Sequence, residues 1–309
     1  TQIPAPRGYA IQLRVNMEAI DARGNVKPQG GTLAVFEPPS GPGVDIVVQG
    51  AVDSELQPLL AALEGRDQVQ IAAWPFWRGR IGSKSVGVSR TEVGPINAAA
   101  ATTLAIVHFR PALILNQGTA GATGPDLKVF DIVVGEATVD YGAFRSAHRD
   151  AGAGVDLSGW APMPHRLRLD GKERIPFSAF PGDGAALRVA TETPYKRGRV
   201  VKGVIGSAFE LNRELDRLTW VRKTYGAVTE DMESAFSAGV AAGFRVPFLA
   251  IRVISDSEFH SPEMQPIAGE YCASFVVDVI KRIEPARGRS TRAGRGDRGV
   301  NRKYGNMAP

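Results

Sequence analysis

Short apolar runs alternate with helical repeats along residues 44–283, and this alternation restricts the possible folds more than any other feature of the sequence. Val44–Gly50 has the pattern of a buried strand, and Asp53–Leu63 has its leucines at helical spacing. An Ala-rich helix is expected at Ile96–Phe109, before a strand at Ala112–Asn116. Strand, helix and strand in succession predict an α/β fold with a mostly parallel, twisted sheet flanked by helices on both faces.

The rest of this region continues the same order. Further strands are expected at Ile71–Trp77, Ser85–Ser89, Asp131–Gly135, Val200–Gly206 and Phe248–Ile254, and further helices at Asp231–Phe244 and Ala268–Ile283. Residues 142–195 contain many prolines and give no clear element. Because no internal repeat is present, we expect one domain over residues 44–283, preceded by a Pro- and Gly-rich extension at residues 1–43.

The C-terminal residues carry the net positive charge. Residues 281–309 hold nine Lys or Arg and two acidic residues, so this end contributes +7 to a total of +5 and leaves the rest of the chain at −2. Residues 284–309 are therefore expected to form a basic tail in contact with solvent. A nucleic-acid partner is not favoured, because only Tyr304 among the aromatic residues lies between these charges.

Membrane insertion and disulfide bonding are not expected. The apolar runs at residues 101–107 and 248–254 are much shorter than the ~20 residues of a membrane span. Cys272 is the single cysteine, and it lies in an apolar helical pattern that favours a buried packing role. The chain starts at Thr1, so a periplasmic or secreted location is expected if a signal peptide was removed, and a cytoplasmic one otherwise.

Several acidic residues fall at the carboxyl ends of expected strands, where a parallel sheet exposes its ligand crevice. Asp256 follows an apolar strand, so partial burial would raise its pKa and let it act as a general acid. A helix N-cap or an Asx turn also explains Asp256, and on the residues alone this is the better explanation. Glu55 is also explained as a first-turn helix residue, and Glu233 as part of a solvated helix face.

Metal and nucleotide-phosphate motifs are not evident. His108, His148, His165 and His260 lack metal-ligand spacing, so neither a zinc site nor a Ser-His-Asp triad is supported. The glycine-rich segment at residues 118–124 fits neither the Walker nor the dinucleotide-binding spacing. No cofactor and no metal are therefore expected.

The order of the segments is more specific than any one of them. The chain contains, in succession, the blocks Val88–Ala99, Leu113–Gly121, Leu127–Val134, Glu230–Ala235 and Pro247–Asp256. In this order they closely resemble the methylthioadenosine/S-adenosylhomocysteine nucleosidases, which belong to the nucleoside phosphorylase superfamily. The resemblance covers residues 44–283 and implies a nucleoside phosphorylase-like fold. It also implies hydrolysis of the N-glycosidic bond of a purine nucleoside, with no cofactor and with a homodimer or higher homo-oligomer as the assembly.

The resemblance also implies roles for individual residues. Asp256 would protonate N7 of the purine, and Glu55 would activate the attacking water with Arg252 nearby. Glu233 and Met232 would hold the ribose. The remaining substrate-binding residues implied are Phe209 in the base-stacking loop, Thr119 where the family often has serine, Ser255 and Glu210.

The base-stacking loop departs from the family pattern. It reads Ser207-Ala-Phe-Glu210, whereas the family commonly has aspartate first and an apolar residue fourth, so base or 5′-group preference is expected to differ.

Two alternatives to this function remain at the level of sequence. A phosphorylase would need a basic phosphate loop after the first strand, but acids occur there, so Arg90 or Arg145 would have to bind phosphate. A non-catalytic nucleoside-binding protein is disfavoured by the joint presence of Glu55, Glu233 and Asp256.

Overall fold

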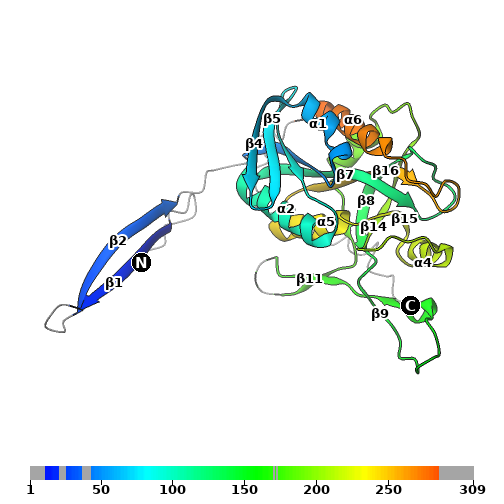
Figure 1. Cartoon of the computed structure of the whole chain (residues 1–309), viewed down its shortest axis with the longest axis horizontal. Helices are drawn as coiled ribbons and strands as arrows, with labels where there is room; N and C mark the ends of the chain where they lie inside the picture. The colour runs from blue at the N-terminus through cyan, green and yellow to red at the C-terminus, as the bar shows by residue number, and fades with distance from the viewer. Residues whose placement is uncertain (1–10, 21–25, 37–42, 170, 172, 285–309) are drawn as a thin grey trace. The chain divides into compact units, whose positions relative to one another are not determined.

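The computed structural model describes residues 11–20, 26–36, 43–169, 171 and 173–284, and its chain forms two compact units, 1–43 and 44–309. In the first unit, strands β1 (Ile11–Ile20) and β2 (Val26–Phe36) pair in antiparallel fashion as a hairpin (Figure 1). The basic tail predicted at residues 284–309 lies outside the described residues, apart from Glu284. The boundaries at residues 43 and 284 therefore remain predictions.

A ten-stranded sheet forms the centre of the second unit. Nine strands follow the order β13-β8-β14-β15-β7-β3-β6-β5-β4, and the tenth, β16, pairs with both β7 and β8. The strands are β3 (Val44–Gly50), β4 (Glu64–Ile71), β5 (Trp74–Ile81), β6 (Lys84–Arg90), β7 (Pro111–Ala122), β8 (Ile132–Asp140), β13 (Phe180–Pro181), β14 (Val200–Ser207), β15 (Ala227–Asp231) and β16 (Phe248–Asp256).

The sheet is mixed, which corrects the expectation of a mostly parallel sheet. Strand β3 runs parallel to β6 and β7, β14 runs parallel to β8 and β15, and β16 runs parallel to β7. The pairs β4–β5, β5–β6, β7–β15, β8–β16 and β8–β13 are antiparallel. Two of these antiparallel pairs arise because hairpins join β4, β5 and β6.

Five strands close into a ring. Each of β8, β14, β15, β7 and β16 is hydrogen-bonded to the next, and β16 returns to β8. Closure satisfies the backbone donors and acceptors that an open sheet would leave at its edges. The sheet is therefore partly closed, and the ring holds the carboxyl ends of β7, β15 and β16 close to one another.

Helices cover both faces of the sheet, as the sequence predicts. They are α1 (Gln57–Ala62), α2 (Pro95–Phe109), α3 (Gly184–Thr191), α4 (Leu215–Tyr225), α5 (Ser234–Phe244) and α6 (Ile267–Arg282). Helix α1 packs near α6, and α2 packs near α5 on the other side (Figure 1). On β3, Ile46 and Val48 face the apolar cluster under α1 and α6, whereas Val47 faces the cluster under α2 and α5. This alternation is the two-residue period of a strand buried on both faces.

Residues 142–195, which the sequence leaves unplaced, contain short elements. They are β9 (Phe144–Arg145), the 3₁₀ turn η2 (Leu157–Gly159), β10 (Ala161–Pro162), β11 (His165–Leu167), β12 (Ile175–Phe177), β13 and α3. Strand β9 pairs with β10, and β11 pairs with β12. Each of these strands is only two or three residues long, so no hydrophobic period marks it in the sequence.

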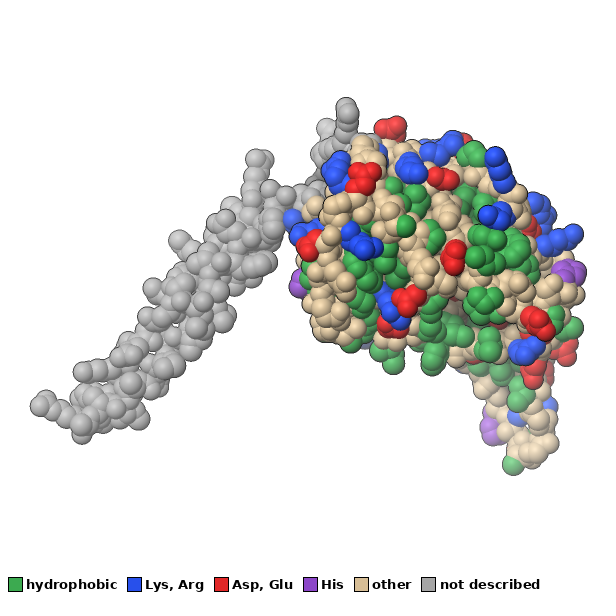
Figure 2. Space-filling view, turned by 45° about the horizontal axis from the view of Figure 1, so that its top comes forward, with side chains coloured by type: hydrophobic (Ala, Val, Ile, Leu, Met, Phe, Trp, Pro, Cys, Tyr) green, Lys and Arg blue, Asp and Glu red, His purple; other side chains and the backbone are tan. Residues whose placement is uncertain are grey.

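Among the described residues, no helix has the length and hydropathy needed to cross a membrane. On the face shown in Figure 2, acidic and basic side chains lie interspersed with hydrophobic groups. That face offers no continuous basic surface of the kind that binds nucleic acid.

Candidate active site

Glu55 lies just beyond the carboxyl end of β3, in the 3₁₀ turn η1 (Asp53–Glu55). Its Oε2 accepts hydrogen bonds from the backbone N–H of Ala51 (2.7 Å) and of Val52 (3.4 Å). Its Oε1 accepts from both the N–H (2.8 Å) and the hydroxyl (3.0 Å) of Thr119 on β7. The bond to Val52 fits the first-turn role, but the contacts with Thr119 add a role across the sheet. The buried carboxylate is fixed between two strands.

The backbone at Gly118 makes room for this carboxylate. A Cβ at Gly118 would stand 2.5 Å from Oε1 of Glu55, closer than non-bonded atoms approach. The next residue, Thr119, supplies the two donors to the same oxygen. Gln117, the residue before Gly118, donates a hydrogen bond from its side-chain amide to the main-chain oxygen of Glu55 (2.7 Å). Three consecutive residues of β7 thus set the position of Glu55.

Arg252 of β16 is buried and is held by two polar partners. Its Nε lies 2.6 Å from Oδ2 of Asp231, and its Nη2 donates to Oδ1 of Asn116 (2.5 Å). Its Nη2 is also 4.0 Å from Oε2 of Glu233. Because a buried guanidinium requires counter-charge, Asp231 balances it, and Arg252 in turn faces the carboxylate of Glu233.

Glu233 precedes helix α5 and is buried, so the solvated-face interpretation is wrong. The predicted helix start at Asp231 is also too early, because Ala227–Asp231 is a strand. Oε1 of Glu233 accepts from the N–H of Gly94 at the start of α2 (2.8 Å). Burial, with Asp231 close by, raises the pKa of Glu233 to about 7.

Asp256 is the last residue of β16 and does not cap a helix, since α6 begins only at Ile267. Its Oδ1 accepts a hydrogen bond from the hydroxyl of Ser255 (2.6 Å). Burial raises the pKa of Asp256 above that of an exposed aspartate, as expected of a general acid. In the sheet Asp256 pairs with Gly121 of β7, two residues beyond Thr119, so β7 connects the positions of Glu55 and Asp256.

The remaining predicted residues lie at different depths. Met232 is partly buried between Asp231 and Glu233. Phe209 is 70% exposed, and its ring covers Gly94, whose N–H binds Glu233. Glu210 instead points at α4, where Arg217 holds it through bonds to both carboxylate oxygens (3.0 Å and 2.9 Å). Phe209 thus borders the site, whereas Glu210 is engaged elsewhere.

The structure brings Glu55, Glu233 and Arg252 together, whereas Asp256 lies outside this group. A cleft is lined by Ala51, Glu55, Thr91, Asn116, Gln117, Gly118, Glu233 and Arg252. Its charged residues are two carboxylates and one guanidinium that is already paired with Asp231. Its lining carries more carboxylate than guanidinium groups, which disfavours a phosphate ion. Among the described residues, no group of three His, Cys, Asp or Glu is placed to hold a metal ion.

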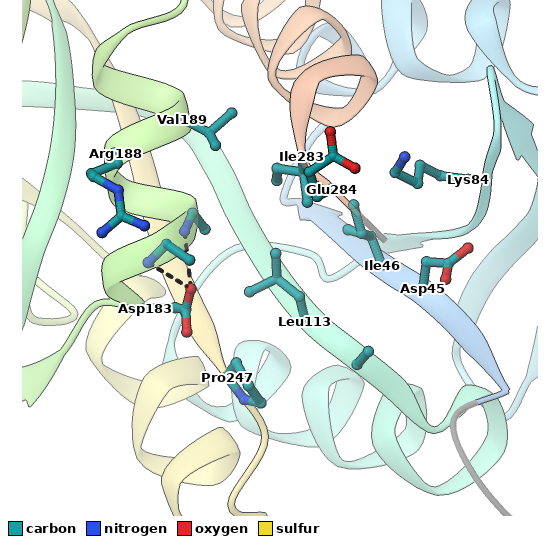
Figure 3. Close-up of a pocket in the computed structure, with 13 residues that line it drawn as sticks. Asp45, Ile46, Lys84, Leu113, Asp183, Arg188, Val189, Pro247, Ile283 and Glu284 are labelled. Carbon is teal, nitrogen blue, oxygen red and sulfur yellow. Dashed lines mark hydrogen bonds between the residues drawn. The ribbon is translucent and has the colours of Figure 1, made fainter. Parts of the chain in front are cut away.

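A second cavity, of about 520 Å³, lies at the opposite ends of the strands (Figure 3). Asp45, Lys84, Leu113 and Pro247 line it near the amino ends of β3, β6, β7 and β16, and Arg188 of α3 lies across it from Lys84. Ligand sites of α/β sheets lie instead beyond the carboxyl ends of the strands. This cavity contains none of the residues that the sequence assigns to the site.

Sequence reasoning missed the polar residues that support the site. Asp231 lies within the Glu230–Ala235 block, yet its pairing with Arg252 joins two strands, β15 and β16, that are not neighbours in the sheet. Asn116 was noted only as the end of a strand, although it binds Arg252. The sequence shows only that each is a polar residue at the end of an apolar run, and this pattern does not identify the residue that it binds.

Comparison with known proteins gives the family. The profile of the phosphorylase superfamily matches residues 45–281. A 5′-methylthioadenosine/S-adenosylhomocysteine nucleosidase of Geobacillus kaustophilus is 30% identical over 251 residues, which cover 77% of this chain and 97% of that protein.

Solved structures share the fold. The nucleosidase of the same name from Neisseria meningitidis, in complex with methylthio-immucillin-A, aligns with a TM-score of 0.62 and 24% identity over 77% of this chain and 98% of its own. Futalosine hydrolase of Helicobacter pylori aligns with a TM-score of 0.62 and 20% identity, over 77% of this chain and 98% of its own. At these identities the likeness concerns the fold.

Proposed function

Because this chain belongs to the phosphorylase superfamily, and within it to the 5′-methylthioadenosine/S-adenosylhomocysteine nucleosidases, we propose that it hydrolyses the N-glycosidic bond of a purine nucleoside. The enzyme is an N-glycosidase that releases a free base and a ribosyl product. The observation that carries this function is that Glu55, Glu233 and Arg252 line one cleft. Asp256 of β16 pairs in the sheet with Gly121 of β7, which is two residues beyond Thr119, the residue that binds Glu55. The substrate is methylthioadenosine, S-adenosylhomocysteine or a related nucleoside.

Asp256 acts on the departing base. Cleavage leaves negative charge on the purine, and a proton delivered to N7 removes that charge as the bond breaks. Partial burial keeps the Asp256 carboxyl protonated to a higher pH than in solvent, because it raises the pKa of this group. The hydroxyl of Ser255 fixes the orientation of the carboxyl group. Asp256 is therefore the general acid, and Ser255 positions it.

Glu55 acts on the attacking water. Its Oε1 accepts two hydrogen bonds from Thr119, whereas Oε2 accepts only one short bond, from Ala51, so Oε2 is the oxygen that accepts from a bound water. Glu233 and Met232 hold the ribose, where positive oxocarbenium character develops, and a nearby carboxylate stabilises that charge. Phe209 covers this side of the site with an exposed ring, suited to stacking on the base. Arg252 positions Glu233 by charge.

Water, rather than phosphate, is the nucleophile. Arg90, one candidate for phosphate binding, is already paired with Asp53 (2.9 Å) and Glu92 (3.0 Å). Arg145, the other candidate, is exposed on β9 and is not among the residues of the cleft. Both carboxylates of the cleft would repel a phosphate ion.

The direct test is a screen of purine nucleosides for released base, with and without added phosphate. We expect base release without phosphate and no increase when it is added. Strict dependence on phosphate would establish a phosphorylase instead, and no release from any purine nucleoside would leave only a binding function.

The enzyme forms a homodimer or a higher homo-oligomer. Four exposed apolar side chains, Val93, Ile96, Phe209 and Leu211, are here called the Phe209 patch. The ring of Phe209 touches Gly94, between Val93 and Ile96 in sequence, so α2 and the loop after β14 share this surface. Exposed apolar groups of this kind beside a site mark a protein contact.

A further inference from the structure

The register of three strands places two carboxyl groups on either side of one glycine. Gly121 of β7 is the partner of Glu230 on β15 and also of Asp256 on β16. Neighbouring strands lie about 4.8 Å apart, so side chains on the same face of such a row are neighbours. A Cβ at Gly121 would lie 3.3 Å from Oδ2 of Asp256 and 3.9 Å from Oε1 of Glu230. The missing side chain of Gly121 leaves a gap bordered by both carboxyl groups.

One oxygen of Glu230 is fixed by neighbours, and the other faces this gap. Oε2 accepts from the hydroxyl of Tyr141 (2.8 Å) and from the amide of Asn212 (2.7 Å). The same amide also donates to the hydroxyl of Tyr141 (3.0 Å), so the three groups form one network. Within the described part of the chain, no protein group donates to Oε1 of Glu230. The network thus orients Oε1 toward Gly121 and Asp256.

A purine presents two neighbouring groups on the edge that carries N7. In adenine these are the N7 acceptor and the 6-amino donor, whereas hypoxanthine and guanine present the N7 and O6 acceptors. We propose that Glu230 selects for a 6-amino purine by accepting a hydrogen bond from the 6-amino group beside the N7 contact of Asp256. This inference rests on the proposed function, because it takes Asp256 to lie at N7. Glu230 is thereby a specificity-determining residue of the same site.

The charge of Glu230 depends on the groups around it. Burial raises its pKa to about 7, and the negative charges of Glu210 and Asp256 act in the same direction. Tyr141 and Asn212 favour the ionised form through their hydrogen bonds. Above pH 7 an ionised Glu230 accepts from a 6-amino group and repels O6. Below pH 7 a protonated Glu230 donates to O6, so the preference for 6-amino purines should weaken as the pH falls.

Glu230→Gln tests this assignment sharply. The Gln amide oxygen would take the place of Oε2 between Tyr141 and Asn212, which turns its NH₂ group toward the gap. A donor there suits O6 and opposes the 6-amino group. The matched control is Glu258→Gln, because Glu258 also faces Asp256 electrostatically but is paired with Arg213 (2.9 Å) and is not a strand partner of Gly121.

Two readouts are measured for wild type and both variants. The first is the ratio of kcat/KM for 5′-methylthioadenosine and 5′-methylthioinosine. The second is the ratio of Kd for free adenine and free hypoxanthine, measured by calorimetry. Each ratio is expressed as the preference for the 6-amino compound. In Glu230→Gln we expect both preferences to fall at least about tenfold, the usual effect of a hydrogen bond to a charged group. In Glu258→Gln both should stay at the wild-type value. In wild type both preferences for the 6-amino compound should decrease when the pH is lowered from 8 to 6.

The outcomes separate this inference from the proposed function. Equal loss of activity on both nucleosides in Glu230→Gln, with unchanged base preference, would show a structural role and overturn the inference. A different result would contradict the hydrolytic function instead. In that case the protein cleaves no nucleoside, yet it binds adenine more tightly than hypoxanthine and loses this preference in Glu230→Gln. Adenine binding that does not respond to Glu230→Gln would overturn the inference whatever the activity.

Discussion

At the scale of single residues, the two oxygens of Glu55 have different partners. Oε2 is bound by the turn after β3, and Oε1 is bound by Thr119 of β7. Replacing Glu55 with Gln keeps the shape of the side chain but removes the carboxylate that we propose as the base. We expect kcat to fall by a factor on the order of 10²–10⁴, the usual contribution of general-base catalysis. Steady-state kinetics on the best nucleoside of the screen would measure this loss.

Binding serves as the control for Glu55→Gln. Glu233 and the ring of Phe209 remain in place to hold sugar and base, so the Kd of a purine nucleoside should change little. A variant with full turnover, or one that loses binding as completely as turnover, would show that Glu55 is not the base.

The value of kcat/KM should fall as the pH rises, because Asp256 loses the proton that N7 requires. Burial raises the pKa of Asp256, so this loss occurs at a higher pH than for an exposed aspartate. In Asp256→Asn, activity should be strongly reduced and the decline at high pH should disappear. Undiminished activity of Asp256→Asn would refute its assignment as the acid.

The identity of the acidic residues at the site could be predicted from sequence, but their contacts could not. Asp256 and Glu233 are assigned to the site by the resemblance to a known family, whereas the residue patterns alone favour a cap and a solvated helix face. That Glu230 and Asp256 share Gly121 depends on the antiparallel pairing of β15 with β7. Strand pairing between segments over a hundred residues apart leaves no local pattern, and so the role of Glu230 was not visible before the fold.

At the scale of elements, β7 determines how closely Glu55 approaches the sheet. Gly118→Ala would place a methyl group 2.5 Å from Oε1 of Glu55 and push the carboxylate out of position. Because misplacement of a catalytic group by about 1 Å costs on the order of 100-fold in rate, we expect kcat to fall by about that factor. Kinetics together with thermal unfolding would separate lost activity from lost stability.

Gly243→Ala provides the matched control for Gly118→Ala. Gly243 lies in α5, and a methyl group added there would have no neighbouring atom within 4 Å. Alanine at this position should therefore leave kcat unchanged and raise stability slightly. An active Gly118→Ala enzyme would show that β7 does not constrain Glu55.

Elements with a strong hydrophobic period were predicted closely, whereas short strands and exposed hairpin strands were not. The strand Val44–Gly50 has the predicted bounds, α2 begins one residue earlier than predicted, and α6 begins and ends one residue earlier. The expected strand Ile71–Trp77 instead spans the turn between β4 and β5, because Ala72 and Ala73 carry no turn signal. Hairpin strands exposed on one side have weaker apolar patterns than the buried strands of the centre.

At the scale of the whole molecule, the Phe209 patch predicts self-association. Ile96 is 82% exposed, and a charge introduced there would oppose contact with a second copy. We expect Ile96→Glu to shift the enzyme from an oligomer to its 33.0 kDa monomer in analytical ultracentrifugation. Val107→Glu is the control, since Val107 is 57% exposed on the same helix but lies outside the patch. A monomeric wild type, or an Ile96→Glu variant of unchanged mass, would exclude this surface as the interface.

The closed ring of five strands has a consequence for synthesis on the ribosome. Strand β16 is the last strand in the described part of the chain, yet it lies between β7 and β8 and carries both Arg252 and Asp256. Until β16 has been synthesised, the nascent chain lacks Arg252 and Asp256, and β7 and β8 each have an unpaired edge. Unpaired edges are able to pair with other chains, so the chain is most exposed to association with its neighbours before β16 closes the ring.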